Sequence, residues 1–261
     1  MRTILIALCV ASAARAHDFW LAADPPRPAA GAKAAVRLHI GDRFASEGEK
    51  PLTRDGTARF LAWHGGKQLD LMPPKSAKPA GVIEAAAGTC LVALDRAPRL
   101  ITLEAAKFDA YLKEEGLEEA LAEREKRGES KKPGRERYGR SIKLLFRAGG
   151  EGSGEWKRVV GQALEIVPLS DPTGLKPGDD LAVRLLEDGK PLAGARITAY
   201  SRQEGKVGEK HATTSSKGEA TFRIGTAGPW LLRLVRMKRV KSKDADWESR
   251  WSALSFDVPG K

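Results

Sequence analysis

The chain has 261 residues and carries 45 Lys and Arg against 34 Asp and Glu, a formal net charge of +11. No recognisable nucleic-acid-binding motif accompanies this basic excess, and we interpret its densest runs, residues 131–140 and 233–243, as solvated faces, so we expect no nucleic-acid partner. The chain is long enough to be stabilised by burial of apolar side chains, and two hydrophobic cores are expected rather than one.

Residues 1–16 predict a secretory signal peptide. Arg2 precedes the apolar run TILIALCVASAA, and the small residues Ala14 and Ala16 stand just before a cleavage point. The run is shorter than the roughly 20 apolar residues of a membrane-spanning helix, and no other segment is suited to cross a bilayer. We therefore expect a periplasmic or secreted protein that does not span the membrane and that begins at His17 after cleavage behind Ala16.

Cleavage would change both the charge and the cysteine content. Loss of Arg2 and Arg15 leaves 43 basic and 34 acidic residues, a formal charge of +9, and loss of Cys9 leaves a single cysteine, Cys90. One thiol excludes an internal disulfide. Because Cys90 lies in the apolar run AAAGTCLVALDR, we expect it to be a small buried core residue rather than a nucleophile.

The first half of the mature chain reads mainly as strands. In AAVRLHIG, residues 34–41, the apolar side chains alternate with Arg37 and His39, which is the period of a half-buried strand. A charged segment with apolar residues near helical spacing interrupts this pattern and predicts a helical insert at about residues 105–128, divided into two short helices at Gly116. The other expected strands are residues 58–64, 88–95, 100–105 and 137–149.

A glycine-rich polar stretch, AGGEGSGEWK, separates this half from a second run of strands and predicts a long turn or linker. The later strands follow one another without intervening helices, an arrangement typical of an antiparallel sandwich. We therefore predict a mostly β protein of two antiparallel β-sandwich domains of the Ig-like or prealbumin-like kind. The first spans residues 17–160 and holds the helical insert, and the second spans residues 161–261.

Several segments in this order resemble a known family. They are AHDFWL at the mature start, FDAYLKEEGLEEALAEREKRG followed by RERYGRSIKLL, and then GQALEIVPLSDP, LLEDGKPLAGARITAY, GPWLL and WESRWSALSFDV. The chain resembles the exported bacterial family catalogued as domain of unknown function 4198, formerly described as NikM-like periplasmic nickel-uptake components. The resemblance implies two β-sandwich domains and a role as an accessory to metal uptake, with a membrane uptake system or an envelope component as partner.

The second half is also similar to transthyretin-like and carboxypeptidase-regulatory-like sandwiches. The similarity rests on DGKPLAGARITAY followed by the glycine turn in TTSSKGEATF. Where that pattern usually has an acidic residue in the turn, this chain has Ser215, Ser216 and Lys217 before Gly218. We therefore do not expect the turn to bind calcium through carboxylates.

The strongest candidate for a metal-binding residue is His17. If it is the first residue of the mature protein, its free amine, with a pKa of about 8, and the Nδ1 of its imidazole can chelate one metal ion. A further imidazole would complete a histidine brace like the copper sites of lytic polysaccharide monooxygenases and CopC-like carriers. Nitrogen donors of this kind suit nickel(II) or copper(II), which we predict as the bound ion.

Few residues are candidates for the other ligands of this metal ion. His39 is ranked first and His64 second, because both share the first predicted domain with His17, whereas His211 lies in the second. Asp18, and after it Asp42, could supply oxygen. The alternative interpretation is that these histidines are ordinary surface residues and that His17 merely adjoins a processing site.

Signatures of enzymes are scarce. The sequence has no G-x-S-x-G, H-E-x-x-H or C-x-x-C motif and no phosphate-binding glycine loop, so we expect a non-catalytic protein. Two alternatives to a metal-uptake accessory stay open. One is a structural or adhesive envelope module that binds protein or glycan, and the other is a copper-dependent polysaccharide oxidase, which would need the brace and a flat exposed aromatic surface.

Overall fold

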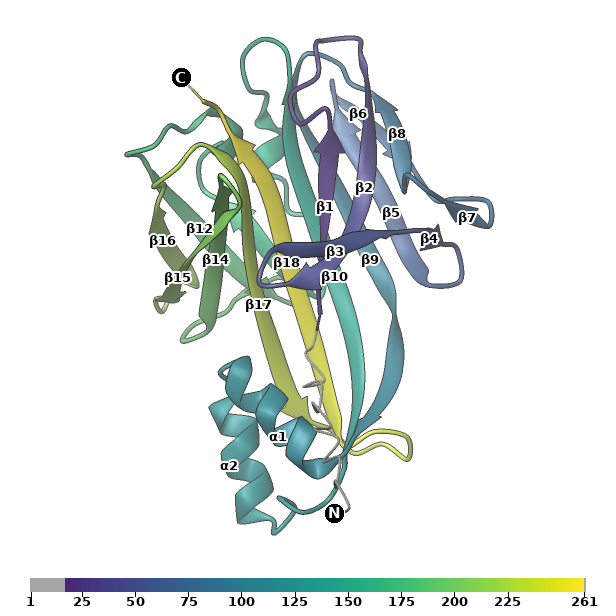
Figure 1. Cartoon of the computed structure of the whole chain (residues 1–261), viewed down its shortest axis with the longest axis vertical. Helices are drawn as coiled ribbons and strands as arrows, with labels where there is room; N and C mark the ends of the chain where they lie inside the picture. Colours follow the sequence, from purple (N-terminus) through teal and green to yellow (C-terminus); the bar gives the residue numbers. More distant parts are fainter. Residues whose placement is uncertain (1–16, 261) are drawn as a thin grey trace, which may run out of the picture.

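A computed structural model describes residues 17–260, and the predicted signal peptide, residues 1–16, lies outside the described residues. The described part is built mainly of strands, with two helices grouped at one end of the long axis (Figure 1). Within it, no helix is both long enough and apolar enough to cross a bilayer.

The first sheet has four antiparallel strands, with β2 in its middle. One edge of β2 pairs with β1, and the other edge pairs with β3 and then β8. The predicted alternation is present, because Val36 and Leu38 of β2 are fully buried. The strands are β1 (Asp18–Asp24), β2 (Lys33–Asp42), β3 (Ala45–Lys50) and β8 (Gly81–Glu84), and β4 (Leu52–Thr53) and β7 (Ser76–Ala77) form a separate ribbon.

The second sheet is the largest and contains strands from both halves of the chain. Its order is β15-β14-β17-β18-β10-β9-β5-β6. Every neighbouring pair is antiparallel except β10 and β18, which run parallel. The strands are β5 (Thr57–His64), β6 (Lys67–Asp70), β9 (Gly88–Leu103), β10 (Gly134–Ala148), β14 (Arg196–Gln203), β15 (Lys206–Thr213), β17 (Gly228–Arg239) and β18 (Trp247–Val258).

The third sheet comes from the second half of the chain only. β12 pairs with β11 along one edge and with β13 and β16 along the other, and all the pairings are antiparallel. The strands are β11 (Leu164–Pro168), β12 (Asp180–Glu187), β13 (Lys190–Pro191) and β16 (Glu219–Arg223). Short 3-10 turns at Gly154–Lys157 and Pro172–Gly174 flank β11.

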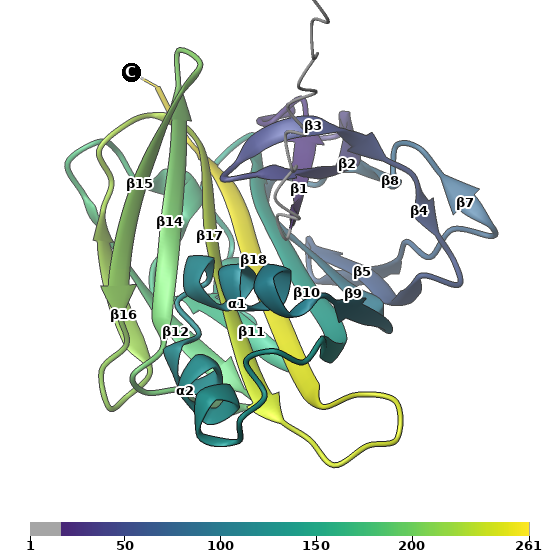
Figure 2. The same cartoon turned by 60° about the horizontal axis from the view of Figure 1, so that its bottom comes forward.

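The large sheet is covered on both faces, by a different layer on each. On β10, Leu144 belongs to the core shared with the first sheet, whereas the next residue, Leu145, belongs to the core shared with the third sheet. The same alternation occurs on β18 between Ala253 and Leu254. Since successive side chains of a strand point to opposite faces, the large sheet is the middle layer between two cores (Figure 2).

The helical insert lies in front of β17 and β18 in Figure 2. It consists of α1 (Ala105–Glu114) and α2 (Glu118–Lys126), divided at Gly116, which confirms the predicted pair of short helices. Gly116 has a φ of +67°, a conformation that glycine adopts without steric cost. Tyr111 of α1 stacks on Trp251 of β18, with the ring centroids 5.9 Å apart, so the insert closes a third core against the large sheet.

The prediction of a mostly β sandwich protein is confirmed, but the two sandwiches are not separate bodies. The predicted boundary near Gly161 lies in the loop before β11, while the large sheet continues across it through the pairing of β10 with β18. Cys90 is fully buried in the first core, and burial raises the pKa of its thiol to about 12. This is the environment expected of an inert core residue.

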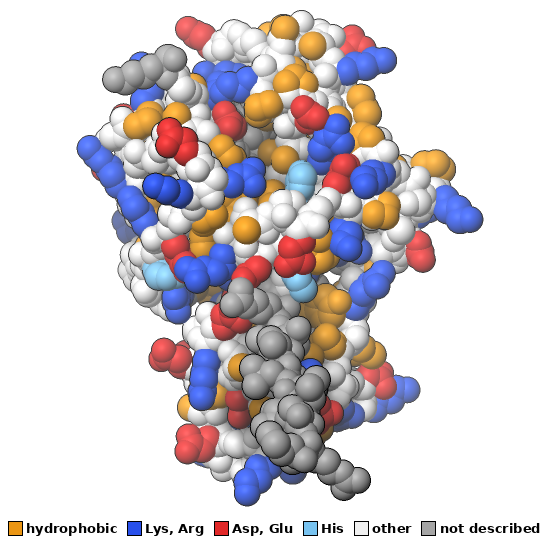
Figure 3. Space-filling model, in the orientation of Figure 1, with side chains coloured by type: hydrophobic (Ala, Val, Ile, Leu, Met, Phe, Trp, Pro, Cys, Tyr) orange, Lys and Arg blue, Asp and Glu red, His pale blue; other side chains and the backbone are white. Residues whose placement is uncertain are grey.

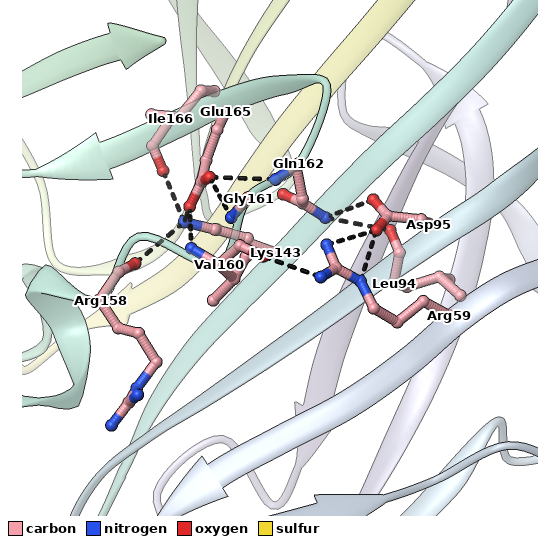
Figure 4. Close-up of polar contacts among 10 residues, drawn as sticks. All are labelled: Arg59, Leu94, Asp95, Lys143, Arg158, Val160, Gly161, Gln162, Glu165 and Ile166. Atoms are coloured by element: carbon pink, nitrogen blue, oxygen red, sulfur yellow. Dashed lines mark hydrogen bonds and ion pairs between the residues drawn. The ribbon is translucent and has the colours of Figure 1, made fainter. Parts of the chain in front are cut away.

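A buried ion pair fixes the passage from the first half of the chain to the second (Figure 4). Lys143 of β10 donates to the carboxylate of Glu165 in β11, and their side chains are only 2% and 1% exposed. Glu165 also accepts hydrogen bonds from the backbone N–H groups of Val160, Gly161 and Gln162, at 2.8 to 3.1 Å. Because all these groups are hydrogen-bonded, the buried charges are compensated.

The loop before β11, which contains Val160, Gly161 and Gln162, is also bonded to strands β5 and β9. The side-chain amide of Gln162 donates to Asp95 at 2.8 Å, and Asp95 pairs with Arg59 at 2.6 Å. Arg59 in turn donates to the backbone carbonyl of Val160 at 2.8 Å. The loop before β11 is therefore bonded to three strands of the large sheet.

Replacing one member of the buried pair should be costly. We expect Lys143→Met to lower the free energy of unfolding by about 3–5 kcal/mol, because the Glu165 carboxylate would stay buried without a cation. Adding Glu165→Gln to this variant should restore part of the loss. Urea unfolding of the single and double variants measures both effects. Arg127→Met, which breaks the exposed pair with Glu123, is the control and should leave the stability nearly unchanged. Equal losses of stability in Lys143→Met and Arg127→Met would contradict the prediction.

Candidate functional site

His17 is the first described residue and directly precedes β1. Its Nε2 lies 3.0 Å from Oε2 of Glu47, and 41% and 53% of the two side chains are exposed. Glu47 is the extra residue of a β-bulge, because its neighbours Ser46 and Gly48 pair with consecutive residues of β2. A bulge changes the direction of the side chain it carries, and here it brings a carboxylate from β3 to the start of β1 across the intervening β2.

The hairpin that presents Glu47 requires glycine at position 41. A Cβ there would lie 1.9 Å from the carbonyl oxygen of Ala45, too close for any side chain. The turn itself passes through Arg43 and Phe44, both with positive φ. Backbone geometry therefore fixes this carboxylate at the start of β1.

His39, the first-ranked partner of His17, lies elsewhere on the same sheet. It pairs across the strands with Trp20, three residues from His17, which corresponds to about 10 Å along a strand. Its ring stacks on Trp20, and its Nδ1 is 3.1 Å from the hydroxyl of Ser46. Burial lowers the pKa of His39, although Glu49 opposes this effect. The structure does not bring the two imidazoles together.

The other histidines also have their own partners. His64 is buried on β5 in the large sheet, and its Nδ1 accepts a hydrogen bond from the backbone N–H of Ala86 at 3.1 Å. His211 on β15 contacts Thr198 and Glu209. Among residues 17–260, no three side chains of His, Cys, Asp or Glu are grouped so as to hold a metal ion. Of the predicted nitrogen donors, only His17 lies at the start of β1.

Asp18 is a buried partner of an arginine rather than a free oxygen donor. Its Oδ1 lies 2.6 Å from Nε of Arg233 on β17, and the same guanidinium reaches Glu115 at 2.7 Å. The three side chains are 10% exposed or less. This cluster joins the start of β1, the end of α1 and the middle of β17, so the position of the residue next to His17 is fixed in the fold.

Burial perturbs both carboxylates of this cluster. It raises the pKa of Glu115 to about 7, although Arg233 opposes the shift. Burial also raises the pKa of Asp18. One guanidinium compensates one carboxylate, and the second carboxylate therefore ionises at a cost.

A cavity of about 320 Å³ adjoins His17. Its lining residues come mainly from the start of β1, helix α1 and the adjacent parts of β9, β10 and β18. Figure 1 shows how these elements are arranged. The walls of the cavity are mainly aromatic and aliphatic, with one cation and one carboxyl group. The lining residues are His17, Phe19, Ile40, Ile101, Leu103, Tyr111, Glu136, Tyr138, Arg140 and Trp251.

The cation is Arg140 of β10, which is half-buried among rings. Its guanidinium carbon lies 4.3 Å from the ring centroid of Trp251, 4.8 Å from that of Phe19 and 5.7 Å from that of Tyr138. Arg140 belongs to the basic run 131–140, and Arg233 to the run 233–243. The interpretation of both runs as solvated faces is therefore wrong for these two residues, because Arg233 is buried in β17 and Arg140 of β10 is half-buried among aromatic rings.

The sequence pattern missed Arg140, Arg233, Glu115 and Glu47. The run RERYGRSIKLL offered one signal, since its charged residues continue directly into a buried strand. Elsewhere the surface mixes both charges: basic and acidic side chains are interspersed on the face shown in Figure 3.

Comparison with known proteins identifies one family. The family described as "Domain of unknown function (DUF4198)" matches residues 14–238. No curated protein matches the chain. Among solved structures, the "D0-D1 domain of Intimin" is 13% identical, with 92% of this chain and 97% of that chain covered and a TM-score of 0.22.

The raised pKa of Glu115 predicts a pH dependence of stability. Between about pH 4.5 and 7 the folded protein holds a proton on Glu115 that the unfolded chain has lost, so this group makes stability fall as the pH rises through that range and has no further effect above it. Glu115→Gln should remove this component, which amounts to at most roughly 3 kcal/mol because each pKa unit corresponds to about 1.4 kcal/mol.

Urea unfolding from pH 4.5 to 8 of the wild type and the variant gives the difference directly. Glu114→Gln, which changes the exposed neighbouring carboxylate, is the matched control and should keep the wild-type slope. Parallel stability curves for Glu115→Gln and the wild type would contradict the prediction.

Proposed function

The chain belongs to the DUF4198 family, whose description names no function, and we propose from the geometry at His17 that it is an exported, non-catalytic protein that binds one nickel or copper ion. Cleavage after Ala16 would convert the backbone nitrogen of His17 from an amide into a free amine. That amine and the imidazole would form a chelate on one residue, with the nitrogen donors that Ni(II) and Cu(II) prefer. The ion is cargo, and the recipient is a membrane uptake system or an envelope component.

The contact between His17 and Glu47 carries this proposal. It occupies Nε2 and leaves Nδ1 without a partner among the described residues. In a neutral imidazole, an N–H at Nε2 that donates to Glu47 places the lone pair on Nδ1, the nitrogen that can chelate together with the amine. Histidines that bind metals generally donate their other ring N–H to a carboxylate or carbonyl group in this way. Glu47 is thus a positioning residue and not itself a ligand.

The site is accessible and rigidly placed. Both side chains are roughly half exposed, so an ion can arrive from solvent and leave again. The adjoining Asp18 is anchored on Arg233, which limits the movement of the chain at His17. Because His39 and His64 have other partners, the remaining coordination positions are open to water and to donors from the recipient.

The amine is the decisive donor to test. Mature protein that begins at His17, verified by mass spectrometry, should bind Cu(II) or Ni(II) in calorimetry. His17→Ala, and a form with one alanine added before His17, should both bind at least about tenfold more weakly, a difference of about 1.4 kcal/mol. His39→Ala is the matched control and should bind like the wild type. Equal affinity of the extended and native forms would show that the amine is not a ligand.

The role of Glu47 is tested separately. Glu47→Gln should weaken metal binding about 10- to 100-fold, because the imidazole loses the carboxylate that orients it. Glu84→Gln changes an exposed carboxylate on β8 of the same sheet and should leave the affinity unchanged. Equal affinities of the two variants would remove Glu47 from the site.

A further inference from the structure

Arg140 is a cation without an acidic partner. It makes no ion pair and no hydrogen bond with any residue of the described range 17–260, and its guanidinium contacts aromatic rings instead. Two acidic groups, Asp18 and Glu136, interact electrostatically with Arg140, and both have other bonding partners. Asp18 is bonded to Arg233, and Glu136 accepts hydrogen bonds from Tyr111 and Ser249.

A second arginine nearby, Arg96, also lacks an acidic partner among the described residues. Arg96 of β9 pairs with Arg140 across the strands, and its guanidinium carbon lies 5.6 Å from the ring centroid of Phe19, which Arg140 also contacts. Arg96 likewise has no ion pair within the described residues. Burial lowers the pKa of both arginines. A desolvated charge is normally paired, and contacts with aromatic rings replace only part of that compensation.

Arg233, the buried arginine of this face, has acidic partners. Arg233 pairs with Asp18 and Glu115. Burial raises the pKa of Glu136, whose carboxyl group already accepts hydrogen bonds from Tyr111 and Ser249. Arg140 therefore has no carboxylate at ion-pair distance among residues 17–260, and its attraction to Asp18 acts over a longer range.

The geometry points to a binding site for a small organic monocarboxylate in this cavity, with Arg140 as the partner of the carboxylate group. A volume of about 320 Å³ lies at the lower end of the range for small-molecule sites, which are mostly apolar with a few placed polar groups. The planar guanidinium offers two parallel N–H donors to a carboxylate. The rings of Phe19, Tyr138 and Trp251, with Ile101 and Leu103, suit an aromatic or branched apolar body.

This site lies beside the proposed metal site but does not depend on it. His17 borders the cavity, whereas Arg140 and the rings need no metal to hold a carboxylate. Binding measured in the presence of EDTA therefore tests the carboxylate site alone. A protein that binds metal but no carboxylate, or the reverse, separates the two proposals.

The test uses phenylacetate and its neutral analogue phenylacetamide as probes of the mature wild-type protein in EDTA. Calorimetry should show phenylacetate binding at least about tenfold more tightly than phenylacetamide. Arg140→Met keeps the length of the side chain but removes the charge, and it should abolish this preference. Arg137→Met changes an exposed arginine of the same strand and is the control that should retain it. Leu103→Trp should fill the cavity and weaken both probes.

Three results would overturn the proposal. They are equal binding of acid and amide by the wild type, unchanged phenylacetate binding by Arg140→Met, and no saturable binding of phenylacetate or indole-3-acetate up to about 10 mM. In any of these cases Arg140 is a structural cation held by rings. Should Arg140→Met not fold, Arg140→Lys together with the comparison of acid and amide on the wild type decides the question.

Discussion

The parallel pairing of β10 with β18 is the contact on which the rest of the architecture depends. Paired residues such as Glu136 and Trp247 are 111 positions apart in the chain, and the two strands join the strands of the first half to those of the second in one sheet. Each face of that sheet is then buried by a different smaller sheet. Since neither smaller sheet has another large apolar layer to cover, loss of this pairing would expose both cores at once.

The arrangement also explains where the candidate site lies. The first sheet and the helical insert cover the same face of the large sheet, and they meet at the start of β1. Asp18 from the sheet and Glu115 from the insert share one guanidinium, that of Arg233, at this meeting point. The two covering layers are not continuous there, and the cavity beside His17 occupies the gap.

Buried charges in this protein fall into two groups. Lys143 and Arg233 are each matched by carboxylates and further hydrogen bonds, and they connect separate layers. Arg140 is surrounded by aromatic rings instead and faces a cavity. The first group is explained by the fold alone, whereas Arg140 is better explained by a partner outside the chain. The contrast between them is the physical basis for a ligand site next to the proposed metal site.

Local patterns in the sequence predicted several features: the alternation in β2, the helical spacing broken at Gly116 and the apolar surroundings of Cys90 each follow from residues near one another in the chain. They divided β9 into two strands, residues 88–95 and 100–105, where the structure has one. The same patterns singled out His17. The tertiary structure alone decided that both halves share one sheet, that Glu47 rather than His39 lies beside His17, and that Arg140 is enclosed. These features depend on which strand edges pair and on where a bulge turns one side chain, and both are set by contacts between residues far apart in sequence.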